Sequence, residues 1–133
     1  MTFLRAKPLS PARARLKVRA ALAAAGAPVP SDAVALAAAS SDLIRSLPDW
    51  VDRFGLLKAQ DTIILWFDPR AGEGETFPSQ IVLDLPPGRY FVDTLDVRSH
   101  QWISRESASG GPLVAGLPST GRAVLVRIRA CGV

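Results

Sequence analysis

Apolar segments of strand length, separated by turn residues, fill the chain from residue 62 to residue 129. Thr62 to Phe67 is a continuous β-rich run, and Arg122 to Arg129 alternates apolar with basic side chains. Between them, Gln80 to Leu85 and Arg89 to Arg98 are predicted strands, separated by Pro86-Pro87-Gly88. Shorter strands are expected at 102–103 and 112–115, around a loop at 107–111. Strands at this spacing, divided by Gly and Pro, predict an antiparallel sandwich or barrel.

The first 58 residues, by contrast, are expected to be helical. Ser10-Pro11 supplies a helix cap and a first helical residue, and strong helix formers follow up to Ala25, before Gly26. A second helix is expected from Ser31-Asp32, with one more turn between Asp49 and Phe54. The apolar stripe of this second helix consists of Leu36, Leu43, Ile44 and Leu47. We therefore predict an α+β chain, with a helical segment at 1–58, a small antiparallel β-sandwich at 60–130, and a boundary near residues 55–61.

The positive charge of the chain is concentrated at its N-terminus. Residues 1–31 carry six basic residues and no acid, so of the 16 basic residues only 16 − 6 = 10 face the 12 acids that follow. Such a segment can meet nucleic acid, an anionic membrane surface, an acidic partner or an organelle import receptor. No aromatic residue interleaves with these charges, which argues against specific nucleic-acid recognition. No apolar run is long enough to span a bilayer, and no compartment is assigned.

The catalytic and metal-binding residue types are sparse. One cysteine, Cys131, and one histidine, His100, allow neither an internal disulfide nor a zinc site. The glycine pairs lack the Lys-Ser/Thr of a phosphate-binding loop, so no cofactor is expected. Glu73 and Glu75, near Asp68, are interpreted as a solvated acidic turn. No catalytic residue is assigned; the alternative is a small hydrolase whose site, built from Asp68, His100 or these glutamates, forms at an oligomer interface.

The aromatic residues give the best candidates for binding. Trp66 lies within an apolar run and is expected in the core. Trp102 stands beside His100, Gln101, Ser104 and Arg105, which is the polar company that a sugar-stacking ring needs. Trp102, His100 and Arg105 are therefore the predicted carbohydrate-binding residues.

The segment from Thr62 to Ile128 resembles the C-terminal immunoglobulin-like β-sandwich that follows the catalytic barrel of many glycoside hydrolases. The resemblance is carried by Thr62-Ile-Ile-Leu-Trp-Phe, by Ile81-Val-Leu-Asp-Leu-Pro-Pro-Gly-Arg-Tyr-Phe-Val and by Ala123-Val-Leu-Val-Arg-Ile. A catalytic barrel needs about 250 residues, so its carboxylates have no counterpart in this chain.

The resemblance thus implies a non-catalytic accessory domain that packs against a partner catalytic domain or binds a glycan. Such a domain without its barrel leaves an apolar surface, for which a homo-oligomer is the expected substitute. A third possibility is binding of nucleic acid or a membrane surface through residues 1–31.

Overall fold

Eight β-strands and one α-helix make up the described part of the computed structural model, which comprises residues 7–27, 34–35, 44–47, 51–59, 62–69, 79–117 and 122–131. The helix is α1 (Pro11–Ala24). The short strands are β1 (Lys7–Pro8), β2 (Val34–Ala35) and β3 (Ile44–Ser46). The longer strands are β4 (Val51–Ala59), β5 (Thr62–Pro69), β6 (Ser79–Asp96), β7 (Gln101–Leu117) and β8 (Val124–Ala130).

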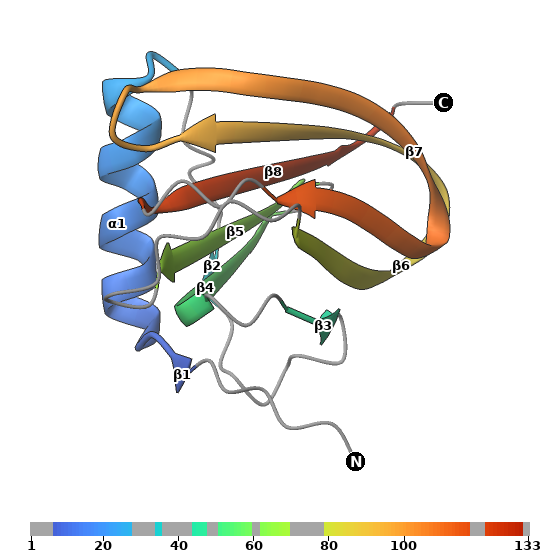
Figure 1. Cartoon of the computed structure of the whole chain (residues 1–133), viewed down its shortest axis with the longest axis horizontal. Helices are drawn as coiled ribbons and strands as arrows, with labels where there is room; N and C mark the ends of the chain where they lie inside the picture. The colour runs from blue at the N-terminus through green and yellow to red at the C-terminus, as the bar shows by residue number, and fades with distance from the viewer. Residues whose placement is uncertain are drawn as a thin grey trace.

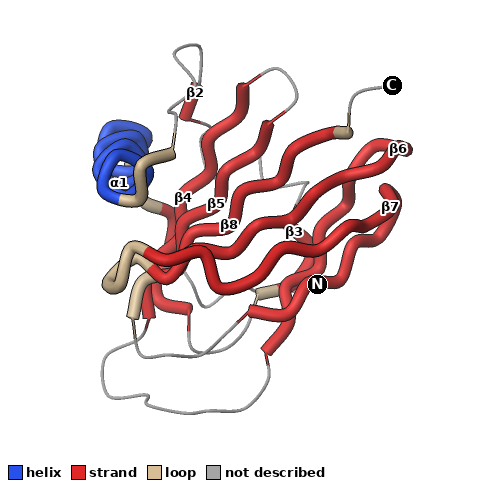
Figure 2. Tube along the Cα trace, turned by 90° about the horizontal axis from the view of Figure 1, so that it is seen from above, coloured by secondary structure: helices blue, strands red, loops and turns tan. Residues whose placement is uncertain are grey.

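All eight strands belong to one mixed sheet. Its order is β1-β4-β5-β8-β6-β3, with β2 added to β4 and β7 added to β6. The β1–β4 pair is parallel and every other pair is antiparallel. Figure 1 and Figure 2 show the long β6–β7 hairpin bending over beside β8, so that the sheet curls into a half-barrel.

The predicted α+β class, with a separate antiparallel sandwich, is wrong. Only α1 is helical among the described residues, and residues 51–54 of the predicted turn of helix before Gly55 lie in strand β4. Ile44 of the expected second helix lies in β3, whereas residues 36–43 of that helix fall outside the described residues. Strand β4 pairs with β5 from Val51 to Ala59 because both of its faces are buried, and this pairing outweighs the local helical spacing.

The two longest strands are also more continuous than expected. The predicted strands at 80–85 and 89–98 form the single strand β6, and the expected loop at 107–111 lies within β7. The register shifts between Leu85 and Arg89, so Pro86 and Pro87 occupy a bulge, where a missing N–H costs no ladder hydrogen bond. Tyr90 stabilises this bend, because its hydroxyl donates to the carbonyl of Pro86 at 2.8 Å.

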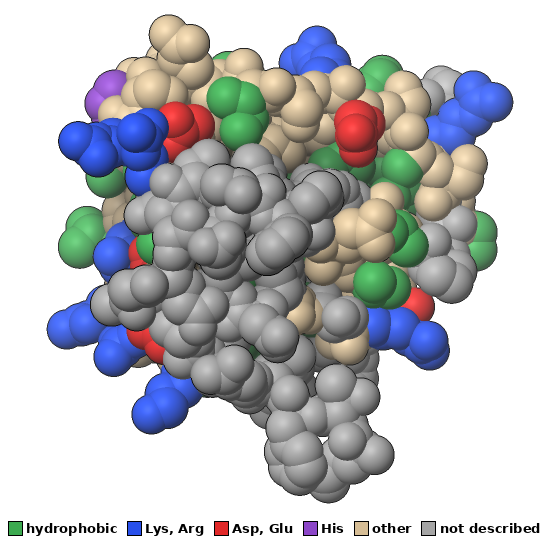
Figure 3. Space-filling model, viewed as in Figure 1, with side chains coloured by type: hydrophobic (Ala, Val, Ile, Leu, Met, Phe, Trp, Pro, Cys, Tyr) green, Lys and Arg blue, Asp and Glu red, His purple; other side chains and the backbone are tan. Residues whose placement is uncertain are grey.

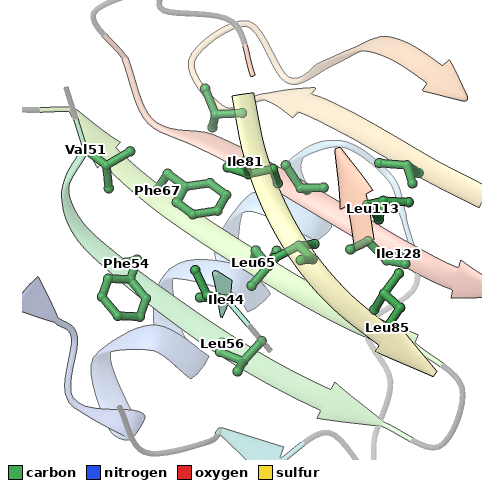
Figure 4. Close-up of a cluster of buried hydrophobic side chains, with 14 of the residues drawn as sticks. Ile44, Val51, Phe54, Leu56, Leu65, Phe67, Ile81, Leu85, Leu113 and Ile128 are labelled. Atoms are coloured by element: carbon green, nitrogen blue, oxygen red, sulfur yellow. The ribbon is translucent and has the colours of Figure 1, made fainter. Parts of the chain in front are cut away.

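The concave inner face of the sheet holds the larger core. Side chains from β3, β4, β5, β6, β7 and β8 meet there, and Figure 4 shows many of them, including Phe54, Phe67 and Ile81. Alternate residues of one strand supply the two faces, so Leu65 and Phe67 point inward while Ile64 and Trp66 point outward. The expectation that Trp66 is a core residue is confirmed, since 5% of it is exposed.

Helix α1 covers one end of the outer face. The hydroxyl of Ser10 accepts from the N–H of Arg13, which confirms the predicted cap, and Ala14, Val18 and Leu22 pack on the sheet. The approach is close at Gly55, where a Cβ atom would lie 2.7 Å from the Cβ of Ala14. The helix therefore buries Leu57, Ile64, Trp66, Leu95 and Leu125, and the rest of the outer face continues beyond it.

Candidate functional site

The outer face of β6, β7 and β8 becomes polar where it leaves α1. On β8, Leu125 packs in the cluster under the helix, and Arg127 and Arg129 follow at the next outward positions. Strand β6 runs antiparallel to β8, so the outward positions of β6 that lead away from the helix are Leu95, Asp93, Phe91 and Arg89 in that order. Directly opposite residues in a sheet share a face, and the register places Asp93 between Arg105 of β7 and Arg127 of β8.

Three arginines converge on the carboxylate of Asp93. Its Oδ1 accepts from Nε of Arg105 at 2.8 Å. Its Oδ2 accepts from Nη2 of Arg129 at 2.9 Å and from Arg127 through Nη2 at 3.0 Å and Nε at 3.3 Å. Three guanidiniums around one carboxylate leave this cluster with a net charge of +2.

The electrostatics of the cluster fix the charge of Asp93. Burial alone would raise the pKa of this carboxyl, because only 2% of the side chain is exposed. The hydrogen bonds from Arg105 and Arg127, with the charges of Arg127 and Arg129, outweigh burial and hold the pKa below its ordinary 3.8. Asp93 is therefore ionised at neutral pH, as a structural counter-charge rather than a proton donor.

Arg127 is held on two sides. Its guanidinium lies over the ring of Trp102, with the Cζ atom 4.3 Å from the ring centroid, while its edge donates to Asp93. The residue is 9% exposed, so this cation–π contact is largely shielded from water. Arg127 links the apolar cluster under α1 to the charged cluster beyond it.

A shallow groove of about 350 Å³ lies on the next part of the same face. It is lined by Arg89, Phe91, Ser107, Ala108, Ser109 and Cys131. Phe91 is 39% exposed although it is a large apolar residue, and it lies directly opposite both Ser107 of β7 and Arg129 of β8. The groove therefore offers an aromatic ring, one cationic side chain and hydroxyl groups.

We call the four residues Arg89, Arg105, Arg127 and Arg129 the arginine strip. Among the outward side chains of β6 to β8, Asp93 is the only acid that contacts the strip, and its two oxygens are already occupied by three of the strip's members. The Nε atom of Arg129 is buried and has no hydrogen-bond partner. The strip therefore carries more positive charge than Asp93 neutralises.

Of the three residues predicted to bind carbohydrate, Trp102 and Arg105 contact this cluster and His100 lies in a turn. Trp102 is half-buried against the cluster under α1 and has Arg127 on its ring. Arg105 donates to Asp93. His100 is exposed in the turn between β6 and β7, with a φ of 59°. Their assignment to a glycan stays a prediction.

The remaining sequence candidates are dispersed or lie outside the described residues. Asp68 accepts from the indole N–H of Trp66 at 2.9 Å, and Glu73 and Glu75 fall outside the described residues. In the described ranges no group of three or more His, Cys, Asp or Glu side chains is placed to hold a metal ion. Cys131 is a free, half-buried thiol at the groove. Among the described helices, none has the length and apolarity to cross a bilayer.

Sequence reasoning missed Asp93, Phe91, Arg89, Arg127 and Arg129 as a site. A usable signal was present, because Phe91 and Asp93 share one face of their strand and Arg127 and Arg129 share one face of theirs. The missing information was that β6 lies between β7 and β8.

Comparisons with known proteins add no family to this description. Neither the scan against protein-family models nor the search of curated proteins finds a match to this chain. The resemblance to a glycoside hydrolase accessory domain, the partner catalytic domain and the homo-oligomer stay predictions.

Proposed function

We propose that this chain is a non-catalytic binding module whose outer sheet face binds an anionic ligand. The observation that carries the proposal is the convergence of Arg105, Arg127 and Arg129 on the single carboxylate of Asp93. Nearby stands a groove with Arg89 and an exposed aromatic ring. Charge that the protein does not neutralise itself attracts a counter-ion or an anionic ligand.

The cluster supports a binding role because it orients its cations before any ligand arrives. Arg129 is bonded to Asp93 through Nη2, and its side chain is 37% exposed. Arg105 is 66% exposed and is anchored at Nε. Anchored guanidiniums lose less side-chain entropy on binding than free ones, and their planar fork suits carboxylate, sulfate and phosphate groups.

The carbohydrate hypothesis remains open in one form. A neutral sugar needs free carboxylate or amide acceptors for its hydroxyl groups, and the acceptors of Asp93 are occupied. A sulfated or uronate-bearing glycan would supply the negative charge that the arginine strip lacks. The proposal therefore includes acidic glycans among the anionic ligands to be tested.

The test is binding of a panel of polyanions at low salt: heparin, polyphosphate and a single-stranded oligonucleotide. We expect at least one to bind, and the Arg89→Gln/Arg129→Gln double variant to weaken that binding at least about tenfold. The matched control is Arg45→Gln, which removes a charge paired with Asp84 on β6, away from the groove. Binding of no polyanion, or equal weakening by Arg45→Gln, would refute the proposal.

A further inference from the structure

The donor and acceptor pattern of the outer face indicates which anion it binds. We propose that the ligand is a single-stranded nucleic acid, with a base stacked on Phe91 and its phosphates bound by Arg89 and Arg129. This inference rests on the proposed function and adds the ligand's chemical class.

Hydrogen-bond donors dominate this surface. The strip and the groove present guanidinium N–H groups and the hydroxyls of Ser107 and Ser109, while both oxygens of Asp93 already accept from arginines. A DNA backbone exposes acceptors only, in its phosphate and deoxyribose oxygens, so a surface rich in donors is complementary to it. A glycan carries many hydroxyl donors, for which the groove side chains offer the serine oxygens as acceptors.

Phe91 supplies a stacking contact that polyphosphate, which has no rings, cannot use. It lies between Arg89 and Asp93 on one face of β6 and opposite Arg129 of β8, so cations stand beside an exposed ring. Outward residues two apart on a strand are about 6.7 Å apart, so adjacent side chains of β6 can hold a phosphate and the neighbouring base. Stacking of a base on an aromatic ring needs an unpaired base, which favours a single strand over a duplex.

The basic helix extends this surface. α1 lies on the outer face, and it carries Arg13, Arg15, Lys17 and Arg19 and no acid. Lys17 lies over the ring of Trp66 with its Nζ 5.5 Å from the centroid. Figure 3 shows Lys and Arg side chains gathered on the side where Figure 1 places α1.

The lack of aromatic residues between the basic residues of the segment 1–31 argued against specific nucleic-acid recognition by that segment alone. In the folded chain, β6 brings Phe91 onto the same face of the sheet as those cations. A nucleic acid longer than the groove would then find further phosphate-binding cations on α1, in addition to stacking on Phe91.

The experiment is fluorescence anisotropy of the full chain with a labelled oligothymidylate of about 15 nucleotides. A duplex of equal length and heparin serve as competitors. Three variants are compared with the wild type: Phe91→Leu, Arg89→Gln and the control Arg45→Gln. We expect Phe91→Leu to weaken binding about tenfold at every salt concentration, since it removes stacking and no charge. Arg89→Gln is expected to lower the salt slope by about 0.7, the value for one phosphate contact of a single strand, and Arg45→Gln to change neither quantity.

Cys131 provides a second readout, because it is the only cysteine of the chain and lines the groove. Bound oligothymidylate should slow its alkylation by iodoacetamide several-fold in the wild type, and less in Phe91→Leu at the same oligonucleotide concentration.

If heparin binds and depends on Arg89 while oligothymidylate does not, the nucleic-acid inference fails and the proposed function stands. If duplex binds as tightly as single strand, or Phe91→Leu binds as the wild type does, the inference also fails. If no polyanion binds, both fail.

Discussion

Asp93 of β6 and Arg127 of β8 lie directly opposite each other in the sheet, and the guanidinium donates twice to one carboxylate oxygen. Arg105 reaches the same carboxylate from β7, on the other side of β6. One acidic side chain thus joins the three strands that carry the candidate site. The stability of the sheet and the geometry of the arginine strip therefore depend on the same residue.

Replacing Asp93 by Asn is expected to destabilise the fold by about 3 kcal/mol, because it leaves the buried Arg127 without a counter-charge. Urea denaturation followed by circular dichroism measures the loss. The control is Asp84→Asn, since Asp84 pairs with Arg45 at a site where both side chains are well exposed, and its loss should stay below about 1 kcal/mol. Equal losses in the two variants would contradict the structural role of Asp93.

The same carboxylate predicts a pH dependence. Because the pKa of Asp93 is lowered on folding, the unfolded chain takes up a proton at this group before the folded chain does. Its contribution to stability is complete above the ordinary pKa of 3.8 and is lost as the pH falls through the lower, folded pKa. The difference in free energy of unfolding between wild type and Asp93→Asn should be constant between pH 5 and 7 and shrink below about pH 4. A difference that stays constant down to pH 2 would show that the carboxylate does not titrate in this way.

Strands β5 and β8 were found close to their observed positions, β5 from its continuous β-rich run and β8 from its alternation. Strand β4 was not, because Asp52, Arg53 and Gly55 interrupt its apolar residues and leave neither signal to detect. Its neighbours on the two faces, α1 and the inner core, decide its conformation. The bend in β6 was misread for another reason: Pro86 and Pro87 usually end a strand, and here they occupy a bulge within one.

For the site, the chemistry of single residues was visible and their convergence was not. Trp102 and Arg105 were selected for their polar surroundings. Trp102 contacts the cluster around Asp93 through Arg127, and Arg105 donates to Asp93 directly. Asp93 and Arg127 are 34 residues apart, and only the strand order brings them together. Local periodicity reports which face a side chain occupies and carries no information about the neighbouring strand.

The close approach of α1 to the sheet gives a third prediction. In Gly55→Ala the new methyl group would lie 2.7 Å from the Cβ of Ala14, so we expect a loss of about 2 kcal/mol as the helix is displaced. Ala14→Gly alone should cost about 1 kcal/mol through helix propensity. The double variant should lose clearly less than the sum of the single losses, because glycine at position 14 makes room for the methyl group. Additive losses in this double-mutant cycle, measured by urea denaturation, would place the helix elsewhere.

The last prediction concerns the bend in β6 at residues 86–88, between Leu85 and the groove residue Arg89. Gly88 has a φ of +145°, a region that other residues rarely adopt, and a Cβ there would meet only the ring and hydroxyl of Tyr90 at 3.8 Å or more. The expected loss in Gly88→Ala, about 1–3 kcal/mol, therefore comes from backbone strain and not from a clash.

Two variants separate this cause from its alternatives. Pro87→Ala tests the neighbouring exposed position and should change the free energy of unfolding by less than about 1 kcal/mol. Gly88→Asn should lose about as much as Gly88→Ala, since a φ of +145° lies outside the left-handed region that Asn tolerates. A clearly larger loss in Gly88→Asn than in Gly88→Ala would point to crowding of the longer side chain at Tyr90 instead. If strain is the cause, Gly88→Ala should also weaken binding at Phe91. The reason is that the bulge sets the register between Arg89 and Ser109, which both line the groove.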